Sequence, residues 1–249
     1  MGAMRKAMAA CAGLALSAMV AGAPAPAQAQ TGWSGFYVGG NVGWVGTNFD
    51  WTFDPSLAPF QDRYSLSENN GIAGVHAGVQ FQWNKIVIGA EIGLSSTAAF
   101  GRDFVRQPIP PAGVNPLTDV AARMGPIFTI GPRLGWAVNN RWLVFVSGGY
   151  ANLTIASQLV NQVNGVPFFP SSRRHDGWYI GGGVEYALTD LLVLGVEYQH
   201  LEFNRLHHCD LPCELNLGGY RRINADTDIV RARLSLKFGR RDTPIEPLK

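Results

Sequence analysis

Charged residues and cysteines are both scarce in this chain. Asp, Glu, Lys and Arg make up 15% of its 249 residues, against about 25% in an average soluble domain. Cysteine occurs only 3 times, too rarely for a small fold held together by disulfides. The 20 Lys and Arg residues nearly balance the 18 Asp and Glu residues, so no basic excess predicts nucleic acid binding. The composition therefore excludes coiled coils, acidic disordered tails and disulfide scaffolds.

Long apolar runs are also missing, except near the N-terminus. Arg5 and Lys6 precede an apolar run over residues 7–23, and Ala-Gln-Ala at 27–29 places small residues where a signal peptidase cleaves. We expect residues 1–29 to be a cleaved signal peptide, with a membrane anchor as the alternative. Later stretches are too short for a transmembrane helix, which leaves a soluble secreted fold or a membrane-spanning β-barrel for the mature chain.

Apolar and polar residues alternate over several long segments. Between Gly71 and Trp83 every odd position after Gly71 is apolar, whereas the even positions are mostly small or polar. The same alternation, with a period of two residues, extends from Ile229 to Phe238. A period of two over such lengths predicts β-strands. Weaker copies complete a set of eight predicted strands and cover residues 36–45, 86–95, 124–138, 143–155, 178–188 and 192–201.

The predicted connections alternate between short and long. Short turns are expected at Asn84–Lys85, 139–141 and 189–190. Long loops are expected at 47–70, 97–122, 159–176 and 204–227. Short periplasmic turns and long extracellular loops are typical of outer-membrane barrels. We therefore predict an eight-stranded, antiparallel, up-and-down transmembrane β-barrel over residues 30–238, followed by a periplasmic tail at 239–249.

The polar face of the strands is rich in glycine, which favours a narrow interior over a solvent-facing wall. This decides against a soluble eight-stranded barrel and places the polar face inside. Charges buried there must be paired, so we expect a lumenal ion network of Glu91, Arg133, Glu185, Glu197, Arg231, Arg233 and Lys237. Aromatic residues near strand ends predict interface girdles and comprise Trp44, Trp83, Trp136, Trp142, Trp178, Tyr198 and Phe238.

The first predicted strand carries a specific motif. Residues 33–44 read Trp-Ser-Gly-Phe-Tyr-Val-Gly-Gly-Asn-Val-Gly-Trp, and Gly195-Val196-Glu197-Tyr198 and Phe238 follow in later strands. This pattern resembles the small proteobacterial outer-membrane β-barrels, the opacity-protein-like surface antigens. The resemblance implies a location in the outer membrane, contact with its lipid and lipopolysaccharide, insertion by the barrel-assembly machinery, and recognition of surface or host ligands through the loops. It also implies a non-catalytic protein without a cofactor. Chains of this family usually end at the final aromatic residue, whereas here eleven residues follow Phe238.

Several loop residues are candidates for chemistry or contact. Cys209 and Cys213 are expected to form a disulfide, with free thiols or a zinc site that includes His207 and His208 as alternatives. His175 follows two arginines and is expected to be a solvated basic tip. The loop aromatics Trp51, Phe53, Phe60, Phe168 and Phe169 are expected either to offer exposed apolar contacts or to pack the loops on each other.

Two other functions remain open beside the structural and surface-recognition role. A narrow pore for ions or small solutes would use the glycine-rich interior. A lipid A-modifying enzyme would need a base on the lipid-facing wall, and His200 has the right parity near the outer end of its strand. However, the serine that such deacylases carry two positions later is Glu202 here. A closed barrel has no free strand edges, so a monomer is expected.

Overall fold

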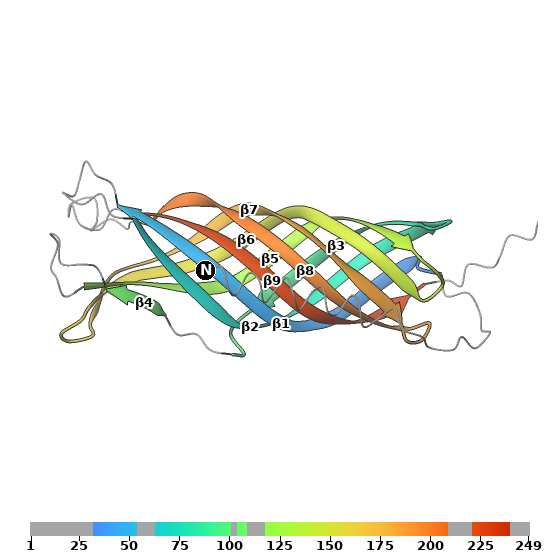
Figure 1. Ribbon diagram of the computed structural model, residues 1–249, viewed down its shortest axis with the longest axis horizontal. Helices are drawn as coiled ribbons and strands as arrows, with labels where there is room; N and C mark the ends of the chain where they lie inside the picture. Colours follow the sequence, from blue (N-terminus) through green and yellow to red (C-terminus); the bar gives the residue numbers. More distant parts are fainter. Residues whose placement is uncertain (1–31, 54–62, 101–103, 109–117, 209–220, 240–249) are drawn as a thin grey trace, which may run out of the picture.

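The computed structural model describes residues 32–53, 63–100, 104–108, 118–208 and 221–239. Each strand pairs with its neighbours in antiparallel fashion, and the β1–β9 and β3–β5 pairs close the long strands into an elongated barrel (Figure 1). The strands are β1 Gly35–Phe53, β2 Arg63–Trp83, β3 Ile86–Ser96, β4 Val105–Pro108, β5 Thr118–Ala137, β6 Trp142–Asn161, β7 Pro167–Ala187, β8 Leu192–His208 and β9 Arg221–Phe238. The expected antiparallel up-and-down barrel is confirmed. Within these ranges, no helix is long and apolar enough to cross a membrane.

The ninth strand is a short addition to the predicted eight. Strand β4 has 4 residues and pairs only with the first part of β5, inside the segment expected to be a long loop. Figure 1 places it near one end of the barrel, which we call the β4 end. The opposite end, the turn end, carries the first residues of β1 and the last residues of β9.

The three short turns form where the sequence predicts them, at the turn end. Asn84 adopts a left-handed φ of 55°, a conformation that Asn tolerates better than most residues. The Asn139 side chain accepts hydrogen bonds from the amides of Arg141 and Trp142, both at 2.9 Å. The Thr189 hydroxyl accepts from the amide of Leu192 at 2.9 Å. Local side-chain acceptors therefore fix these connections.

The long loops are shorter than predicted, because the strands continue into them. Strand β1 runs to Phe53, and β6 and β7 extend until only residues 162–166 connect them. The expected loops 47–70, 97–122, 159–176 and 204–227 are therefore wrong in extent. The reason lies in the pattern itself. In β1 most apolar residues have even numbers up to Trp44 and odd numbers from Val45 onward. The side chains nevertheless keep alternating between the same two faces of the strand.

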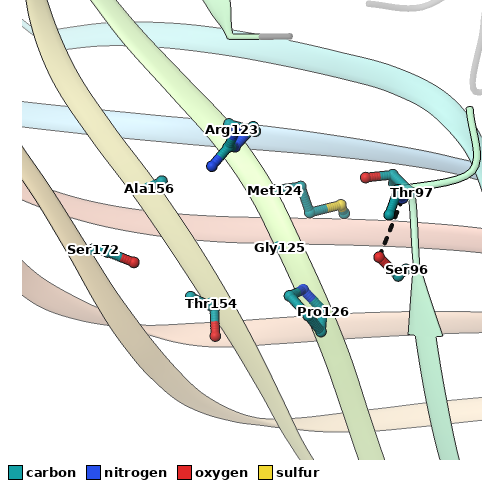
Figure 2. Close-up of a pocket in the computed structure, with 10 residues that line it drawn as sticks. Ser96, Thr97, Arg123, Met124, Gly125, Pro126, Thr154, Ala156 and Ser172 are labelled. Atoms are coloured by element: carbon teal, nitrogen blue, oxygen red, sulfur yellow. Dashed lines mark hydrogen bonds between the residues drawn. The ribbon is translucent and has the colours of Figure 1, made fainter. Parts of the chain in front are cut away.

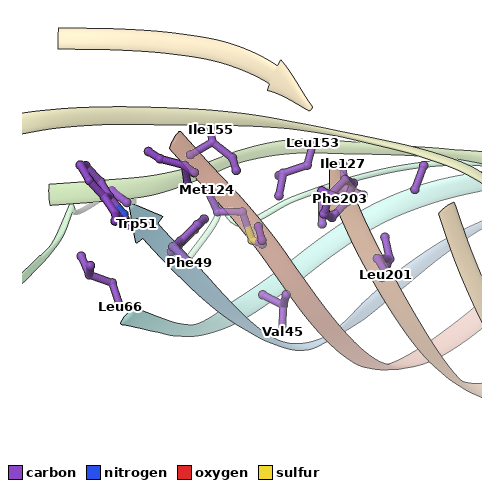
Figure 3. Close-up of a cluster of buried hydrophobic side chains, with 14 of the residues drawn as sticks. Val45, Phe49, Trp51, Leu66, Met124, Ile127, Leu153, Ile155, Leu201 and Phe203 are labelled. Atoms are coloured by element: carbon purple, nitrogen blue, oxygen red, sulfur yellow. The ribbon is translucent and has the colours of Figure 1, made fainter. Parts of the chain in front are cut away.

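This reversal divides the barrel into two halves with opposite polarity. In the half nearer the turn end, apolar side chains cover the outer wall and form what we call the apolar band. Examples are Phe81, Ile88, Val146 and Ile180, which are 69%, 57%, 57% and 57% exposed. In the half nearer the β4 end, apolar side chains point inward instead and form a buried cluster, the outer core (Figure 3).

The outer core resembles the interior of a soluble protein. Phe49 and Trp51 from β1, Leu153 from β6 and Leu201 from β8 are 0% exposed, and Figure 3 shows side chains from separate strands pointing into the space that the strands enclose. Burial of such side chains contributes about 1.5–3 kcal/mol each. This half is therefore held together by the hydrophobic effect in water, without help from lipid.

Candidate functional site

Three arginines and three glutamates meet in the lumen at the level of the apolar band. Arg233 of β9 donates to Glu91 of β3 at 2.9 and 2.5 Å and to Glu197 of β8 at 2.6 Å. Arg133 of β5 lies 2.6 Å from Glu185 of β7. Arg231 contacts Glu197 at 2.8 Å. The six side chains carry equal positive and negative charge, and each is 8% exposed or less.

Aromatic rings complete this layer of ions. The Tyr37 hydroxyl donates to Glu91 at 2.7 Å and accepts from Arg133 at 3.1 Å. The Arg133 guanidinium lies 3.8 Å from the centre of the Phe145 ring. A Cβ at Gly78 would collide with the Tyr37 side chain, so this glycine provides room for the ring. Tyr37 and Phe145 are not among the residues predicted for this network, although their inward parity in β1 and β6 could have identified them.

Lys237, the seventh residue expected in this network, has contacts at the turn end. It donates to the carbonyl of Gly32, and its ammonium lies 5.5 Å from the centre of the Trp33 ring. Trp33 is 1% exposed and belongs to a second buried apolar group that lies across the lumen. We call this group the inner cluster; it consists of Trp33, Val87, Ala137, Leu143, Ala187 and Val193.

His175 and His208 form a buried pair beside the outer core. Their Nε2 atoms lie 2.7 Å apart, and both residues are 0% exposed. His175 Nδ1 lies 2.9 Å from the Asn204 carbonyl, which only accepts, so this nitrogen carries the proton. His208 Nε2 then donates to His175, and the Ser157 hydroxyl, 2.9 Å from His208 Nδ1, donates to it. All of these contacts are satisfied with both rings neutral, and burial lowers the pKa of His175.

The structure contradicts the expectation for His175 and decides between the two alternatives for Trp51. His175 is buried and not a solvated tip, because β7 extends past it and turns its side chain inward. Trp51 is 0% exposed in the outer core and offers no surface contact. Both outcomes follow from the reversed alternation at the β4 end.

The remaining loop predictions have mixed outcomes. His207 is exposed, whereas His208 is buried and bonded to Ser157, so the two side chains lie on opposite faces of β8. Phe53, Phe168 and Phe169 lie within strands whose side chains at those positions are outside the described residues. Phe60, Cys209 and Cys213 also lie outside them, as do the expected signal peptide and most of the expected tail. In the described part of the chain, no three His, Cys, Asp or Glu residues are placed to hold a metal ion.

The predicted girdle aromatics lie on the outer wall. Trp44, Trp83, Trp136, Trp178, Tyr198 and Phe238 are between 42% and 76% exposed. Trp142 is half-buried and packs on Tyr186, with ring centres 4.7 Å apart. Phe36 and Phe238 stack at 5.5 Å at the turn end.

His200 lies on the outer wall at the edge of the apolar band. Its Nδ1 is 2.8 Å from Asp228, and the same carboxylate oxygen accepts from the Tyr198 hydroxyl at 2.7 Å. The residues directly across the ladder from His200 are Ile180 and Asp228. A base oriented by a carboxylate is therefore present, but neither cross-strand position holds a hydroxyl or thiol nucleophile.

The sequence matches the family described as outer membrane protein beta-barrel domain over residues 15–238. It is 27% identical over 225 residues to the 31 kDa outer-membrane immunogenic protein of Brucella melitensis, covering 87% of this chain and 88% of that protein. Among solved structures, it is similar to the attachment invasion locus protein Ail of Yersinia pestis, with a TM-score of 0.40, 10% identity and coverage of 82% and 99%. It is also similar to the outer membrane protease OmpT of Escherichia coli, with a TM-score of 0.45, 10% identity and coverage of 82% and 97%.

Short turns of such barrels lie on the periplasmic side, so the turn end faces the periplasm and the β4 end faces the cell exterior. The apolar band then lies in the lipid. The chain belongs to the outer membrane protein beta-barrel domain family, and it resides in the outer membrane.

Proposed function

We propose that this protein is a closed, non-catalytic surface barrel that strengthens the outer membrane and presents its extracellular half for recognition. The observation that carries this proposal is the filling of the lumen by three successive layers. The inner cluster lies at the periplasmic end, the paired arginines and glutamates lie at the level of the lipid, and the outer core lies above them. The Brucella relative, which is named an immunogenic outer-membrane protein, is in keeping with surface presentation.

A narrow pore is the second candidate, and the burial of the lumenal side chains argues against it. A continuous water path would have to pass Arg233 and Glu197, each 1% exposed, and then the outer core. Opening such a path would separate buried ion pairs, which costs about 3–5 kcal/mol for each broken pair. The closed state is therefore favoured over a conducting one.

Single-channel conductance in a planar bilayer tests the proposal. The refolded wild-type protein should be silent, while a porin of known conductance opens in the same bilayer. Steady openings of the wild type would overturn the closed barrel. If those openings changed ion selectivity in Glu91→Gln or Arg231→Gln, the lumenal charges would be the selectivity elements of a pore.

The enzyme alternative has its own test. Lipid A incubated with the wild-type protein should keep all its acyl chains when examined by mass spectrometry, because no nucleophile stands across the ladder from His200. Loss of an acyl chain with wild type, but not with His200→Ala, would contradict the non-catalytic role. Tyr198→Phe, which removes the hydroxyl that donates to Asp228, serves as the control for damage to the wall.

A further inference from the structure

The residues just before β1 turn away from the wall and cross the periplasmic mouth of the barrel. We call residues 32–34 the N-terminal strap; they include Trp33 and Ser34, which open the sequence motif. Trp33 is 1% exposed and belongs to the inner cluster, whose other members lie on β3, β5, β6, β7 and β8. The strap therefore places an indole ring against the far side of the lumen.

Gly35 is the hinge between β1 and the N-terminal strap. Its φ of 138° lies in a region that favours glycine. A Cβ at this position would also collide with the carbonyl group of Phe238. From Phe36 onward, the residues of β1 are held in ladders with β2 and β9. The chain can therefore change direction at Gly35 without any disturbance of the strands.

Polar bonds hold the strap in its closed position. The Trp33 amide donates to Gln82 Oε1 at 2.7 Å, and the Trp33 carbonyl accepts from Gln80 Nε2 at 2.8 Å. The Gln82 amide donates to the Ser34 hydroxyl at 3.0 Å. On the other side of β1, Lys237 of β9 donates to the carbonyl of residue 32. These four bonds attach the strap to both strands that flank β1, and none of the four is part of a β-ladder.

The closed strap buries two polar atoms that have no hydrogen bond within the described part of the chain. These atoms are Nε1 of Trp33 and Oε1 of Gln80, on residues that are 1% and 2% exposed. A buried donor or acceptor without a partner costs free energy, because it has lost its bonds to water. Both atoms would regain water if the strap opened. This cost offsets part of the gain from burying the indole ring and brings the open and closed states closer in free energy.

The ion network begins directly behind the inner cluster. On β7, Ala187 of the inner cluster and Glu185 are successive inward side chains, and Glu185 lies 2.6 Å from Arg133. Removal of the Trp33 ring from the mouth would therefore bring water next to the innermost ion pair.

The exterior end of the lumen is closed in a different way. A cavity of about 200 Å³ lies in the wall near the β4 end (Figure 2). Met124, one of the residues that line it, is 2% exposed and belongs to the outer core. Entry from this end would require the packed side chains of the outer core to separate. Entry from the periplasm requires only the movement of the three strap residues.

We propose that the N-terminal strap is a reversible stopper of the periplasmic mouth. It opens by rotation about Gly35 while the strands stay paired, and it admits water and small solutes from the periplasm as far as the ion network. The ion network and the outer core stay closed, so no path crosses the membrane. The stopper goes beyond the closed-barrel role, because it gives access to the lumen from one side only.

A buried cysteine can report the opening of the strap. Val87→Cys places a thiol in the inner cluster, and Ala225→Cys places one in the outer core as the control. Both are made in the full chain with its three native cysteines replaced by serine, folded in detergent and treated with a charged methanethiosulfonate. Each rate is divided by the rate of the same thiol in the urea-unfolded chain. The thiol at position 87 should react at least tenfold faster than the thiol at position 225.

Equal rates at the two positions would overturn the stopper, because the mouth would then open only when the whole barrel unfolds. If Val87→Cys does not fold, Val193→Cys takes its place, since Val193 lies in the same cluster and is 3% exposed. The heat-dependent shift in electrophoretic mobility shows that each variant is a folded barrel.

Changes in the strap itself identify it as the barrier. Ser34→Ala removes the hydroxyl that accepts from the Gln82 amide. It should speed up the reaction at position 87 about two- to tenfold, as expected for the loss of one hydrogen bond. Trp33→Ala removes the stopper and should speed up this reaction further. Neither change should alter the rate at position 225. No acceleration at position 87, or equal acceleration at both positions, would overturn the proposal.

Conductance separates the stopper from the closed-barrel role. Trp33→Ala should stay silent in a planar bilayer, because the ion network and the outer core still fill the lumen. Openings in Trp33→Ala but not in the wild type would overturn the statement that these two layers stay closed when the strap opens. Openings in the wild type would refute the closed barrel, whereas the thiol rates alone decide the stopper.

Discussion

At the scale of single residues, the contribution of a glutamate to stability depends on which face of a strand it occupies. Glu197 and Glu202 lie on the same strand, β8, but Glu197 is 1% exposed among arginines whereas Glu202 is exposed on the outer wall. Neutralising Glu197 leaves Arg231 and Arg233 without their shared carboxylate. We expect Glu197→Gln to lower the free energy of unfolding by about 3–5 kcal/mol.

Urea unfolding in lipid vesicles, followed by tryptophan fluorescence, measures this loss. Glu202→Gln is the control and should change the free energy of unfolding by less than about 0.5 kcal/mol, as is usual for surface positions. Similar losses in both variants would mean that the lumenal ion pairs do not stabilise the barrel.

His175 should make the stability of the barrel depend on pH. Burial lowers its pKa in the folded protein, while the unfolded chain keeps a pKa near the ordinary 6.5. Below about pH 6.5 the unfolded chain therefore binds a proton that the folded protein does not. The contribution of His175 to stability is complete above pH 6.5 and declines as the pH falls below it.

Urea midpoints between pH 7.5 and 5.5 should fall in the wild type and fall less in His175→Gln. The raised pKa of Glu68 acts in the opposite direction at lower pH, because there the folded protein holds the extra proton. The difference between wild type and variant at each pH isolates His175. An identical slope in both proteins would contradict the buried, neutral pair of histidines.

At the scale of single strands, the reversal of polarity has a direct test. Leu194 and Glu202 both face outward on β8, but Leu194 lies in the apolar band and Glu202 lies beyond it. A lysine facing lipid near the midplane costs about 2–4 kcal/mol, and the cost falls to about 0–1 kcal/mol near the interface. Leu194→Lys should therefore destabilise the barrel in vesicles far more than Glu202→Lys. Equal effects would place the edge of the lipid elsewhere.

The strands also explain which parts of the fold the sequence could predict. Segments inside the apolar band follow one simple alternation, so their existence, order and turns could be predicted from residues such as Asn84 and Thr189. The extensions above the band alternate just as regularly, but with apolar residues on the other face. From Val45 to Trp51 this change of phase resembles the end of a strand, although it marks a change of surroundings from lipid to water.

The lumenal ion pairs could be predicted only in part. Parity alone brings Glu91, Glu197 and Arg233 to one face of their strands, and the strand order of an up-and-down barrel brings β8 beside β9. Closure of the barrel determines which carboxylate pairs with which guanidinium. No periodicity in the sequence indicates these pairings. The register shift between Met124 and Ile127 in β5 is likewise visible only in the paired strands.

At the scale of the whole molecule, closure of the sheet makes a simple experiment informative. Every long strand has a partner on both sides, and β9 closes on β1. Such barrels resist detergent until they are heated. A folded sample should therefore migrate differently on a gel before and after boiling, whereas an unchanged band would contradict the closed barrel. The same band reports folding for each variant above.

The half of the barrel nearer the β4 end extends beyond the membrane. Strand β6 has 20 residues, so at a rise of about 3.3 Å per residue and a tilt of about 40° it spans on the order of 50 Å along the barrel axis. The apolar band of such barrels is about 25 Å tall, so about 25 Å of rigid wall stands clear of the lipid. An antibody or receptor approaching through the surface sugars would meet rigid, paired strands before it reached the membrane. An epitope on these strands would be conformational and would be lost when the barrel unfolds.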